Sequence, residues 1–449
     1  MSARALLALA LGACTGAEGT VEIELTTAPG SKLLDGVEHM RMIVTSPHQE
    51  VDADRVDGGF ALTLDLSAAG GLGAVIVEGR DANNALVAFG ESPPFAISGI
   101  TARIIVYMPP PMSIESAPLQ LTPARSDLST GTLSFGCLFA GGRLANGEPS
   151  DATAIYNAFD HTITEGLPLP APRAGVALAV DATGHAILFG GAGPDGQPTD
   201  TLWGFDTTFA PTGAYTDLGE QAGFARADQI ALFTATGELV ISGTPAAGFS
   251  NTTTALVARS DIATLPPVGV GLTTSDGILT AVFAGVGTTN GYARFRSDMV
   301  DLPAGDAART GGAITTIPNG QVLFVGGSDA EQQNTDALVL DAMTAVSSPV
   351  PSVLSTPRNH PGIAATSRYL LVAGGTDDGG AALDTVDVID VTDDAVVPVT
   401  TLQMSVPRIS PTLIALPNDA ILIAGGTDQN GQPIATLELF TPDPPPDGN

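Results

Sequence analysis

The chain has 449 residues and a formal net charge of −31, with 48 Asp and Glu against 17 Lys and Arg. So little positive charge argues against a nucleic acid or an anionic lipid surface as a partner, because few counterions would be released on binding. Hydrophobic residues make up 44% of the chain, which is too many for a disordered protein. With 53 glycines, 34 prolines and no long 3.6-residue apolar period, the composition predicts an all-β fold.

The N-terminus resembles a bacterial lipoprotein signal. Its apolar run, residues 5–11, is too short for a membrane-spanning helix of about 20 residues. The run leads into Leu-Gly-Ala-Cys at Cys14, which is similar to the lipobox, whose cysteine is diacylated and becomes the new N-terminus. We therefore expect residues 1–13 to be the signal peptide, 14–18 a tether and Cys14 the lipidation site. An ordinary secretory signal or a misassigned start is the alternative.

The residue after the lipobox bears on where the protein is retained. Thr15 takes the place of the aspartate that holds some lipoproteins at the inner membrane. This favours the outer membrane or the cell surface, with the lipid as the only membrane contact. The other cysteine, Cys137, then has no disulfide partner. It lies in the apolar run 133–139 without a nearby Lys or His, so we expect a small buried hydrophobe.

Residues 19–112 predict a small β-sandwich. About seven short segments alternate apolar and polar residues within roughly ninety residues. No fingerprint selects between an immunoglobulin-like and a transthyretin-like arrangement. Pro109–Pro111 is stiff and extended and marks the expected domain boundary. The clearest strand candidates are Thr20–Thr26, His39–Val44, Phe60–Leu66, Ala74–Val77, Ala85–Phe89 and Ala102–Met108.

Beyond residue 112 the sequence repeats itself. An apolar run that ends in two glycines recurs, and two weaker copies end at Gly243 and Gly285, so that successive copies lie 42 to 52 residues apart. In six copies an arginine precedes the second glycine by 17 or 18 residues, and Pro267 takes its place before Gly285. The strong doublets are Gly141-Gly142, Gly190-Gly191, Gly326-Gly327, Gly374-Gly375 and Gly425-Gly426. The arginines are Arg125, Arg173, Arg226, Arg309, Arg358 and Arg408.

This pattern resembles the kelch repeat family. Each unit reads arginine, apolar strand, Gly-Gly, polar loop and a further apolar strand that in most units ends before Asp or Asn, as at Tyr156-Asn157. The resemblance covers residues 115–446 and implies a β-propeller of seven blades, or six or eight, with one four-stranded sheet per blade. The family's tryptophan is missing, since Trp203 is the only one in the chain. As in kelch propellers that join their chain ends, a strand near Pro118–Leu121 is expected to complete the last blade.

The glycine doublets are predicted to be architectural. A phosphate-binding loop needs glycines that open a helix and usually a lysine, whereas each doublet ends a strand and no lysine follows. Glycine has no Cβ and lets backbones pack closely where blades converge. The acidic turns after the doublets, such as Asp195-Gly196, lack calcium-loop spacing and are expected to be hairpin turns. No metal or cofactor is predicted.

The repeated arginines leave two alternatives. The repeat places them just before the strand expected to line the central channel, where symmetry would form a ring able to bind an anion. Alternatively, each arginine pairs with carbonyls or carboxylates of its own or a neighbouring blade and holds the loop in place. The second alternative is favoured, and the ring is kept as a candidate site.

Enzyme signatures are sparse. The five histidines have no ligand spacing, and no Gly-x-Ser-x-Gly elbow appears. Some kelch-type propellers are copper oxidases with a cross-linked Tyr-Cys pair, but neither Cys137 nor any tyrosine has that context. The leading expectation is a non-catalytic binding module for a protein or polysaccharide of the cell envelope. A glycan hydrolase or isomerase with carboxylates at the channel mouth, and a structural surface component, are the alternatives.

Overall fold

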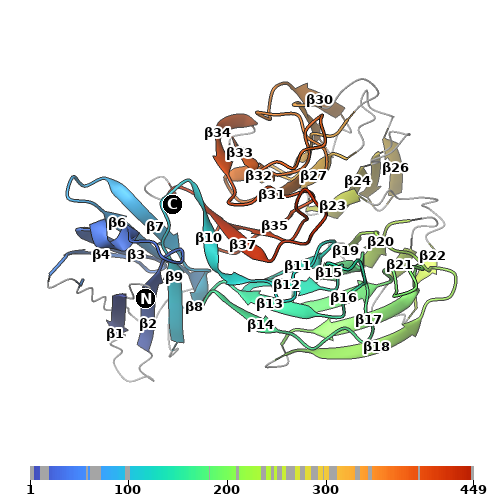
Figure 1. Ribbon diagram of the computed structural model, residues 1–449, viewed down its shortest axis with the longest axis horizontal. Helices are drawn as coiled ribbons and strands as arrows, with labels where there is room; N and C mark the ends of the chain where they lie inside the picture. Colours follow the sequence, from blue (N-terminus) through green and yellow to red (C-terminus); the bar gives the residue numbers. More distant parts are fainter. Residues whose placement is uncertain are drawn as a thin grey trace.

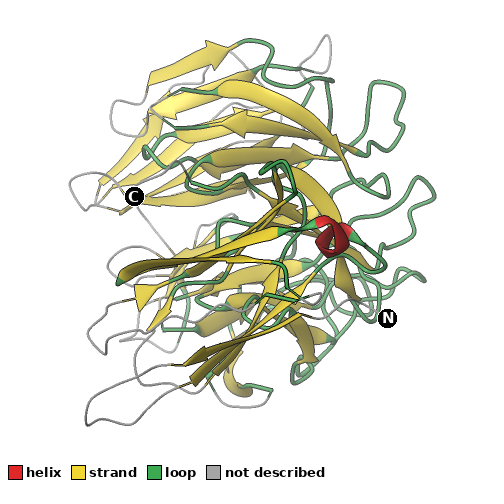
Figure 2. Cartoon of the chain, turned by 90° about the vertical axis from the view of Figure 1, so that its left-hand side faces the viewer, coloured by secondary structure: helices red, strands yellow, loops and turns green. Residues whose placement is uncertain are grey.

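The chain is built from β-strands, as its composition predicts. The computed structural model contains one helix among the residues it describes, the 3-10 turn η1 (Leu33–Gly36), which is red in Figure 2. No helix in this part of the chain is long and apolar enough to cross a membrane. The described residues are 5–10, 20–56, 59–60, 72–96, 102–181, 183–208, 212–233, 239–243, 247–249, 255–258, 268–273, 279–284, 292–296, 298–302, 311–328, 334–341, 346–392 and 395–445.

The first nine strands form an N-terminal unit in which two sheets share one core. Their bounds are β1 (Ala5–Ala10), β2 (Thr20–Thr26), β3 (His39–Thr45), β4 (His48–Asp54), β5 (Leu72–Gly73), β6 (Val75–Arg80), β7 (Leu86–Glu91), β8 (Phe95–Ala96) and β9 (Ala102–Tyr107). The sheets have the strand orders β1-β2-β9 and β4-β3-β6-β7, and β5 pairs with β8. Alternate residues of β3 are buried, and Met40, Met42 and Val44 share a core with Ile23 and Leu25 of β2.

Most of the strand predictions for this unit are confirmed. The candidates from 20, 39, 74, 85 and 102 correspond to β2, β3, β6, β7 and β9. Phe60–Leu66 lies mostly outside the described residues. The polar strand β4 was not expected, because only Val51 and Ala53 of its residues pack against the core. Residues 5–10, expected within the signal peptide, form β1 beside β2, while Cys14 lies outside the described residues.

From residue 113 onward the described chain forms seven four-stranded antiparallel sheets, here numbered 1 to 7. Sheets 1 to 6 each consist of four consecutive strands, which follow one another along the chain in Figure 1. Sheets 1 to 3 contain β11 (Ser129–Leu133), β12 (Gly136–Ala140), β13 (Thr153–Asn157), β14 (Thr162–Glu165), β15 (Ala177–Val180), β16 (His185–Phe189), β17 (Thr201–Asp206), β18 (Ala214–Glu220), β19 (Ala231–Phe233), β20 (Leu239–Ile241), β21 (Ala247–Phe249) and β22 (Val257–Ala258).

Sheet 7 joins distant parts of the chain. Sheets 4 to 7 contain β23 (Val268–Thr273), β24 (Leu279–Ala284), β25 (Tyr292–Arg296), β26 (Asp298–Leu302), β27 (Ala313–Thr316), β28 (Val322–Val325), β29 (Ala337–Asp341), β30 (Val346–Val350), β31 (Gly362–Ala365), β32 (Tyr369–Ala373), β33 (Thr385–Asp390), β34 (Val397–Gln403), β35 (Thr412–Ala415), β36 (Ile421–Ala424), β37 (Thr436–Thr441) and β10 (Ser113–Gln120). Strand β10 precedes sheet 1 in the chain but pairs with β37, with Ser113 opposite Thr441. This confirms that a strand near Pro118–Leu121 completes the last unit.

Hydrophobic cores lie between consecutive sheets. Separate buried clusters join sheets 1 and 2, sheets 2 and 3, sheets 5 and 6, and sheets 6 and 7. A further cluster joins sheet 7 to sheet 1, where Leu422 and Leu439 pack with Cys137 and Phe139. The second strand of a sheet, such as β12, β32 or β36, is buried along its whole length because both of its faces are covered. This burial explains the unbroken apolar run before each glycine doublet.

Candidate functional site

Five of the six predicted arginines can be placed, and all five are buried. Arg125, Arg358 and Arg408 are 0% exposed, Arg173 is 7% exposed and Arg226 is 9% exposed. Each lies in the turn before the first strand of its sheet. Arg309, like Cys14, lies outside the described residues.

The guanidinium groups donate to their own sheets. Nη1 of Arg125 donates to the carbonyl oxygen of Gly141 at 2.6 Å, and Nη1 of Arg408 donates to that of Gly425 at 3.0 Å. Arg358 donates in the same way to the carbonyl of Gly374 at 3.1 Å. The acceptor is thus the first glycine of the doublet in each of these three units. The arginine side chain therefore fixes the turn against the end of the second strand.

Two of the arginines also have a buried carboxylate as a partner. Nη2 of Arg358 lies 2.7 Å from Oδ2 of Asp387, and Nη2 of Arg408 lies 2.8 Å from Oε1 of Glu438. In sheet 2 the guanidinium of Arg173 lies over the Trp203 ring instead, 5.2 Å from its centroid.

Burial lowers the pKa of all five guanidinium groups, to about 10 for Arg125. These groups still carry their charge at neutral pH. These contacts agree with the second alternative, in which each arginine holds a loop of its own sheet in place.

The glycine doublets are the points at which neighbouring sheets touch. The second glycine donates its backbone N–H to the carbonyl of the arginine in the next unit, as from Gly142 to Arg173 at 2.9 Å and from Gly375 to Arg408 at 2.8 Å. A Cβ on Gly425 would lie 3.2 Å from the carbonyl oxygen of Arg125, so sheet 7 also approaches the turn of sheet 1. The doublets have φ between 55° and 104°, a region that favours glycine. Their role is architectural, as predicted.

A further repeated feature was missed by sequence reasoning. The residue two positions after each placed arginine adopts a left-handed backbone conformation, and the corresponding residue of sheet 5 does so as well. Non-glycine residues seldom adopt this conformation, and they concentrate at functional sites. We call the turns that carry these residues the inner turns. The residues are Asp127, Gly175, Asp228, Gly311, His360 and Ser410.

Backbone hydrogen bonds connect the inner turns of successive sheets. The N–H of Asp228 donates to the carbonyl of Gly175 at 2.9 Å, and that of His360 donates to Gly311 at 2.6 Å. The N–H of Ser410 donates to the carbonyl of His360 at 3.1 Å. Asp127, Asp228, His360 and Ser410 are exposed, so these turns present polar side chains on a rigid base. What repeats in the sequence is the position two residues after each arginine. The residue type at that position changes from unit to unit, so the position gives no visible motif.

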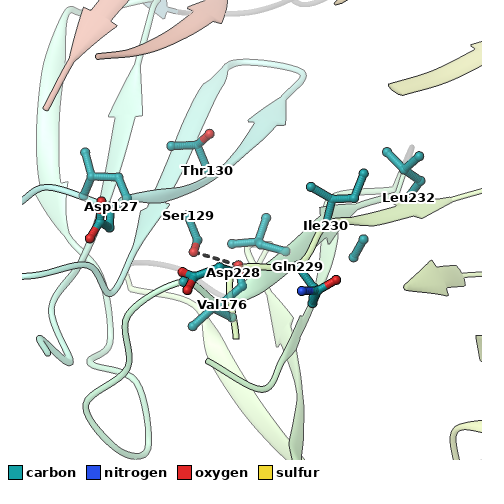
Figure 3. A pocket seen from close by; sticks show the side chains of 12 residues that line it. Asp127, Ser129, Thr130, Val176, Asp228, Gln229, Ile230 and Leu232 are labelled. Atoms are coloured by element: carbon teal, nitrogen blue, oxygen red, sulfur yellow. Dashed lines mark hydrogen bonds between the residues drawn. The ribbon is translucent and has the colours of Figure 1, made fainter. Parts of the chain in front are cut away.

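A cavity of about 390 Å³ opens at the inner turns of sheets 1 to 3 (Figure 3). Asp127 enters it from the turn before β11, and Asp228 enters it from the turn before β19. Its walls include apolar side chains such as Leu128, Val176 and Ile230, and none of the described residues that line it is aromatic. This volume is in the range of small-ligand sites, roughly 300–1,000 Å³.

The two carboxylates of the cavity have different surroundings. Asp127 accepts a hydrogen bond at 3.0 Å from Nε of Arg143. Although the Asp228 side chain is exposed as a whole, partial burial of its carboxyl raises its pKa, the charge of Asp127 raises it further, and Arg143 has the opposite effect. The Asp228 carboxylate packs over Gly175, in the space that a Cβ would occupy. A positive group placed beside Asp228 would therefore offset the repulsion between the Asp127 and Asp228 carboxylates.

The acidic hairpin turns hold their own backbone. Oδ1 of Asp195, Asp377 and Asp428 accepts the N–H of the residue two positions later, at 2.8 to 3.0 Å. Hydrogen bonds from the backbone N–H groups of Gln432 and Asn430 lower the pKa of Asp428. In the part of the chain that the structure describes, no three His, Cys, Asp or Glu side chains are grouped so that they could hold a metal ion.

Cys137 lies in the core, with a tyrosine opposite it on the neighbouring strand. The thiol is buried, as expected, and burial raises its pKa. Strands β12 and β13 pair so that Cys137 lies directly opposite Tyr156, and the Tyr156 hydroxyl lies 2.7 Å from Nδ1 of His161. The sequence alone did not reveal this tyrosine neighbour, because cross-strand pairing brings together residues far apart in the sequence. Burial lowers the pKa of His161 to about 4, so the ring is neutral.

Comparisons with known proteins concern the fold alone. A scan against protein-family models found no match, and a comparison with curated proteins found none either. Among solved structures, the chain is similar to a protein described as a novel fungal alcohol oxidase with catalytic diversity among the AA5 family, in complex with copper. The TM-score is 0.55 and the identity is 13%, over 73% of this chain and 75% of that one. At this identity the likeness supports a shared all-β architecture.

Proposed function

We propose that the chain is a closed seven-bladed propeller of kelch type, preceded by a small β-sandwich and held at the cell envelope by a lipid on Cys14. Closure is supported by the seven sheets, by the pairing of β10 with β37 and by the core that sheets 7 and 1 share. The inner turns then surround one mouth of the central channel. The lipid anchor is supported by the lipobox-like sequence that ends at Cys14.

Within this architecture we propose a non-catalytic binding module for a protein or polysaccharide of the envelope. The observation that carries the proposal is the 390 Å³ cavity with Asp127 and Asp228 at the inner turns. The N–H of Asp228 donates to the Gly175 carbonyl at 2.9 Å and the Ser129 hydroxyl donates to the Val176 carbonyl at 2.8 Å, so the site is largely formed before a partner arrives. A preformed polar cavity on a rigid scaffold is what a binding module requires.

The chemistry of the cavity favours a basic side chain of a protein partner over a sugar. Apolar walls suit the methylene stem of lysine or arginine, and the two carboxylates suit its charged head. Among the lining residues that the structure describes, a sugar ring would find no aromatic face to stack on. The net charge of −31 would also attract a basic partner from a distance.

The test uses the soluble body from residue 19 onward in a pull-down of envelope proteins, on an array of lysine- and arginine-containing peptides, and on a glycan array. We expect binding of basic peptides, weakened about tenfold or more by Asp127→Asn with Asp228→Asn, because both charges of the site are lost. The matched control is Asp35→Asn with Asp378→Asn, which removes two exposed charges away from the cavity. Binding to glycans alone would favour the polysaccharide partner, and silence in all three assays would overturn the proposal.

A second candidate is a glycan-processing enzyme, a hydrolase or an isomerase, because two carboxylates share one cavity. Glycosidases pair an ionised carboxylate with one that is more readily protonated. Asp127 accepts a hydrogen bond from Arg143, and partial burial raises the pKa of Asp228, so the two carboxylates have unlike surroundings. Release of reducing sugar from an envelope polysaccharide by the wild type, and its loss in Asp228→Asn, would favour this enzyme over the binding module.

Copper chemistry is not carried over from the similar alcohol oxidase. The Cys137 thiol has a raised pKa and stays protonated, and Nδ1 of His161 is already hydrogen-bonded to Tyr156. All three side chains are sealed from solvent, at 6% exposed or less. These residues do not fit a copper site that an alcohol must reach.

A further inference from the structure

The N-terminal unit meets sheets 1 and 7 at a polar joint. Figure 1 shows β7 and β9 beside β10 and β37. Nδ2 of Asn418, in the turn between β35 and β36, donates at 2.9 Å to the backbone carbonyl of Glu91 at the end of β7. Tyr107 of β9 packs in the core shared by sheets 7 and 1, and its hydroxyl donates to the Ser116 carbonyl at 3.0 Å. The joint therefore combines apolar packing with hydrogen bonds that cross between the two units.

A small cavity lies within this joint, and one of the residues that line it carries an unsatisfied acceptor. Glu91, Tyr107, His161 and Asn418 are among the residues that line it, and its volume of about 10 Å³ is close to what one water molecule needs. Asn418 is 9% exposed, and its Oδ1 has no hydrogen-bond partner within the described chain. Such a buried acceptor is unfavourable unless a donor reaches it.

Within the described chain, the groups that surround Glu91 include no positive charge that acts on its carboxyl. From the β35–β36 turn, Asp419 adds a negative charge, and from the β13–β14 turn, His161 is neutral, with its pKa lowered by burial to about 4. From β9, Tyr107 keeps its proton, because burial raises its pKa. Burial, and then the charge of Asp419, raise the pKa of Glu91 to about 7, and no cation or hydrogen bond among the described residues offsets this.

We propose that Glu91 and Asn418 form a proton-operated latch between the N-terminal unit and sheet 7. When protonated, the Glu91 carboxyl donates to Oδ1 of Asn418, directly or through one water molecule, and so supplies the missing donor. When ionised, it has no proton to donate and places a charge beside an acceptor and beside Asp419. The latch holds at low pH and loosens as the pH rises. It is independent of what the inner turns bind.

The pH window follows from the two states of Glu91. In the closed joint its pKa is about 7, and in the open joint it returns to its ordinary value of 4.5. The latch therefore stabilises the closed joint fully below the ordinary pKa of Glu91. This stabilisation is lost as the pH rises through the pKa that Glu91 has in the closed joint. Between about pH 5 and pH 8 the equilibrium constant for opening should rise on the order of 50-fold.

Hydrogen–deuterium exchange on the full chain tests the latch. We expect peptides that cover β7 and the β35–β36 turn to lose protection between about pH 5 and pH 8, after correction for intrinsic exchange. Glu91→Gln should stay protected at both pH values, because its amide supplies the donor without titrating. Glu148→Gln, at an exposed position in sheet 1, should behave like the wild type.

Two outcomes would overturn the latch. One is equal protection of the wild-type joint at both pH values, and the other is a wild-type pH dependence in Glu91→Gln. Should that variant fail to fold, carbon-detected NMR of the wild-type Glu91 carboxyl decides the question. A titration midpoint near 7 supports the latch, and a midpoint near the ordinary value of 4.5 contradicts it.

Discussion

Arg358 shows how the inner turns are held in place at the scale of a single residue. It is fully buried, and its donors meet the carbonyls of Gly374 and Thr385 and the carboxylate of Asp387. Removing the cation would leave that carboxylate uncompensated in the interior. We expect Arg358→Met to lower the free energy of unfolding by about 3–5 kcal/mol, measured by urea denaturation.

The exposed pair of Arg143 and Asp127 provides the matched comparison for Arg358. Arg143→Met should lower the free energy of unfolding by less than about 1 kcal/mol, because solvent screens an exposed ion pair. Adding Asp387→Asn to Arg358→Met should recover part of the lost stability, since the unpaired charge is then gone. Unchanged stability in Arg358→Met, together with weaker binding of an anion such as sulfate, would instead support the anion-binding ring.

Arg125 lacks the carboxylate that Arg358 has. Its Nη2 is buried without a partner in the described chain, and Ala154 stands 29 residues later, at the position that Asp387 occupies in its own unit. We expect Ala154→Asp to raise the free energy of unfolding by about 1 kcal/mol at neutral pH, because a buried cation gains a counter-charge. Ala154→Asn should give a smaller gain, and a loss in both variants would show that the site has no room for a larger side chain.

At the scale of the element, the glycine doublets set how closely consecutive sheets approach. A Cβ on Gly374 would collide with the carbonyl oxygen of Arg408, and its φ of 62° is unfavourable for other residues. Gly380 has a φ of 79° but no atom within 4 Å of an added Cβ. We expect Gly380→Ala to lower the free energy of unfolding by about 1 kcal/mol, through the backbone conformation alone. Gly374→Ala should lower it clearly more in the same thermal-unfolding assay. Equal losses would mean that the sheets move apart at no cost.

The sequence allows prediction of the elements that repeat, because a feature shared by several units stands out from residues that vary between them. The apolar run before Gly425-Gly426 predicts β36, and the arginine spacing predicts the turn of Arg408. By contrast, the partner of Arg408, Glu438, could not be predicted, because the position varies between units. The Asp127 and Asp228 site was missed for the same reason. Cross-strand neighbours such as Cys137 and Tyr156 depend on a register that a single sequence does not reveal.

At the scale of the whole molecule, the excess of negative charge opposes folding. With a net charge of −31, carboxylates repel one another across the surface, and dissolved ions screen this repulsion. We expect the Tm to rise by several degrees between about 20 mM and 300 mM NaCl at neutral pH, measured by differential scanning calorimetry. KCl should act equally if the effect is screening, and a Tm that falls with salt would contradict this account.

The pairing of β10 with β37 has a consequence for how the chain can be cut and rejoined. Ser113 and Thr441 are register partners, so the two ends of the seven-sheet body lie side by side. A circular permutant could join them with a few residues and begin instead in the exposed hairpin at Asp378. Within residues 113–441, every strand pair and every contact of the repeated arginines would be kept. The order of the sheets along the gene is therefore separable from their order in space.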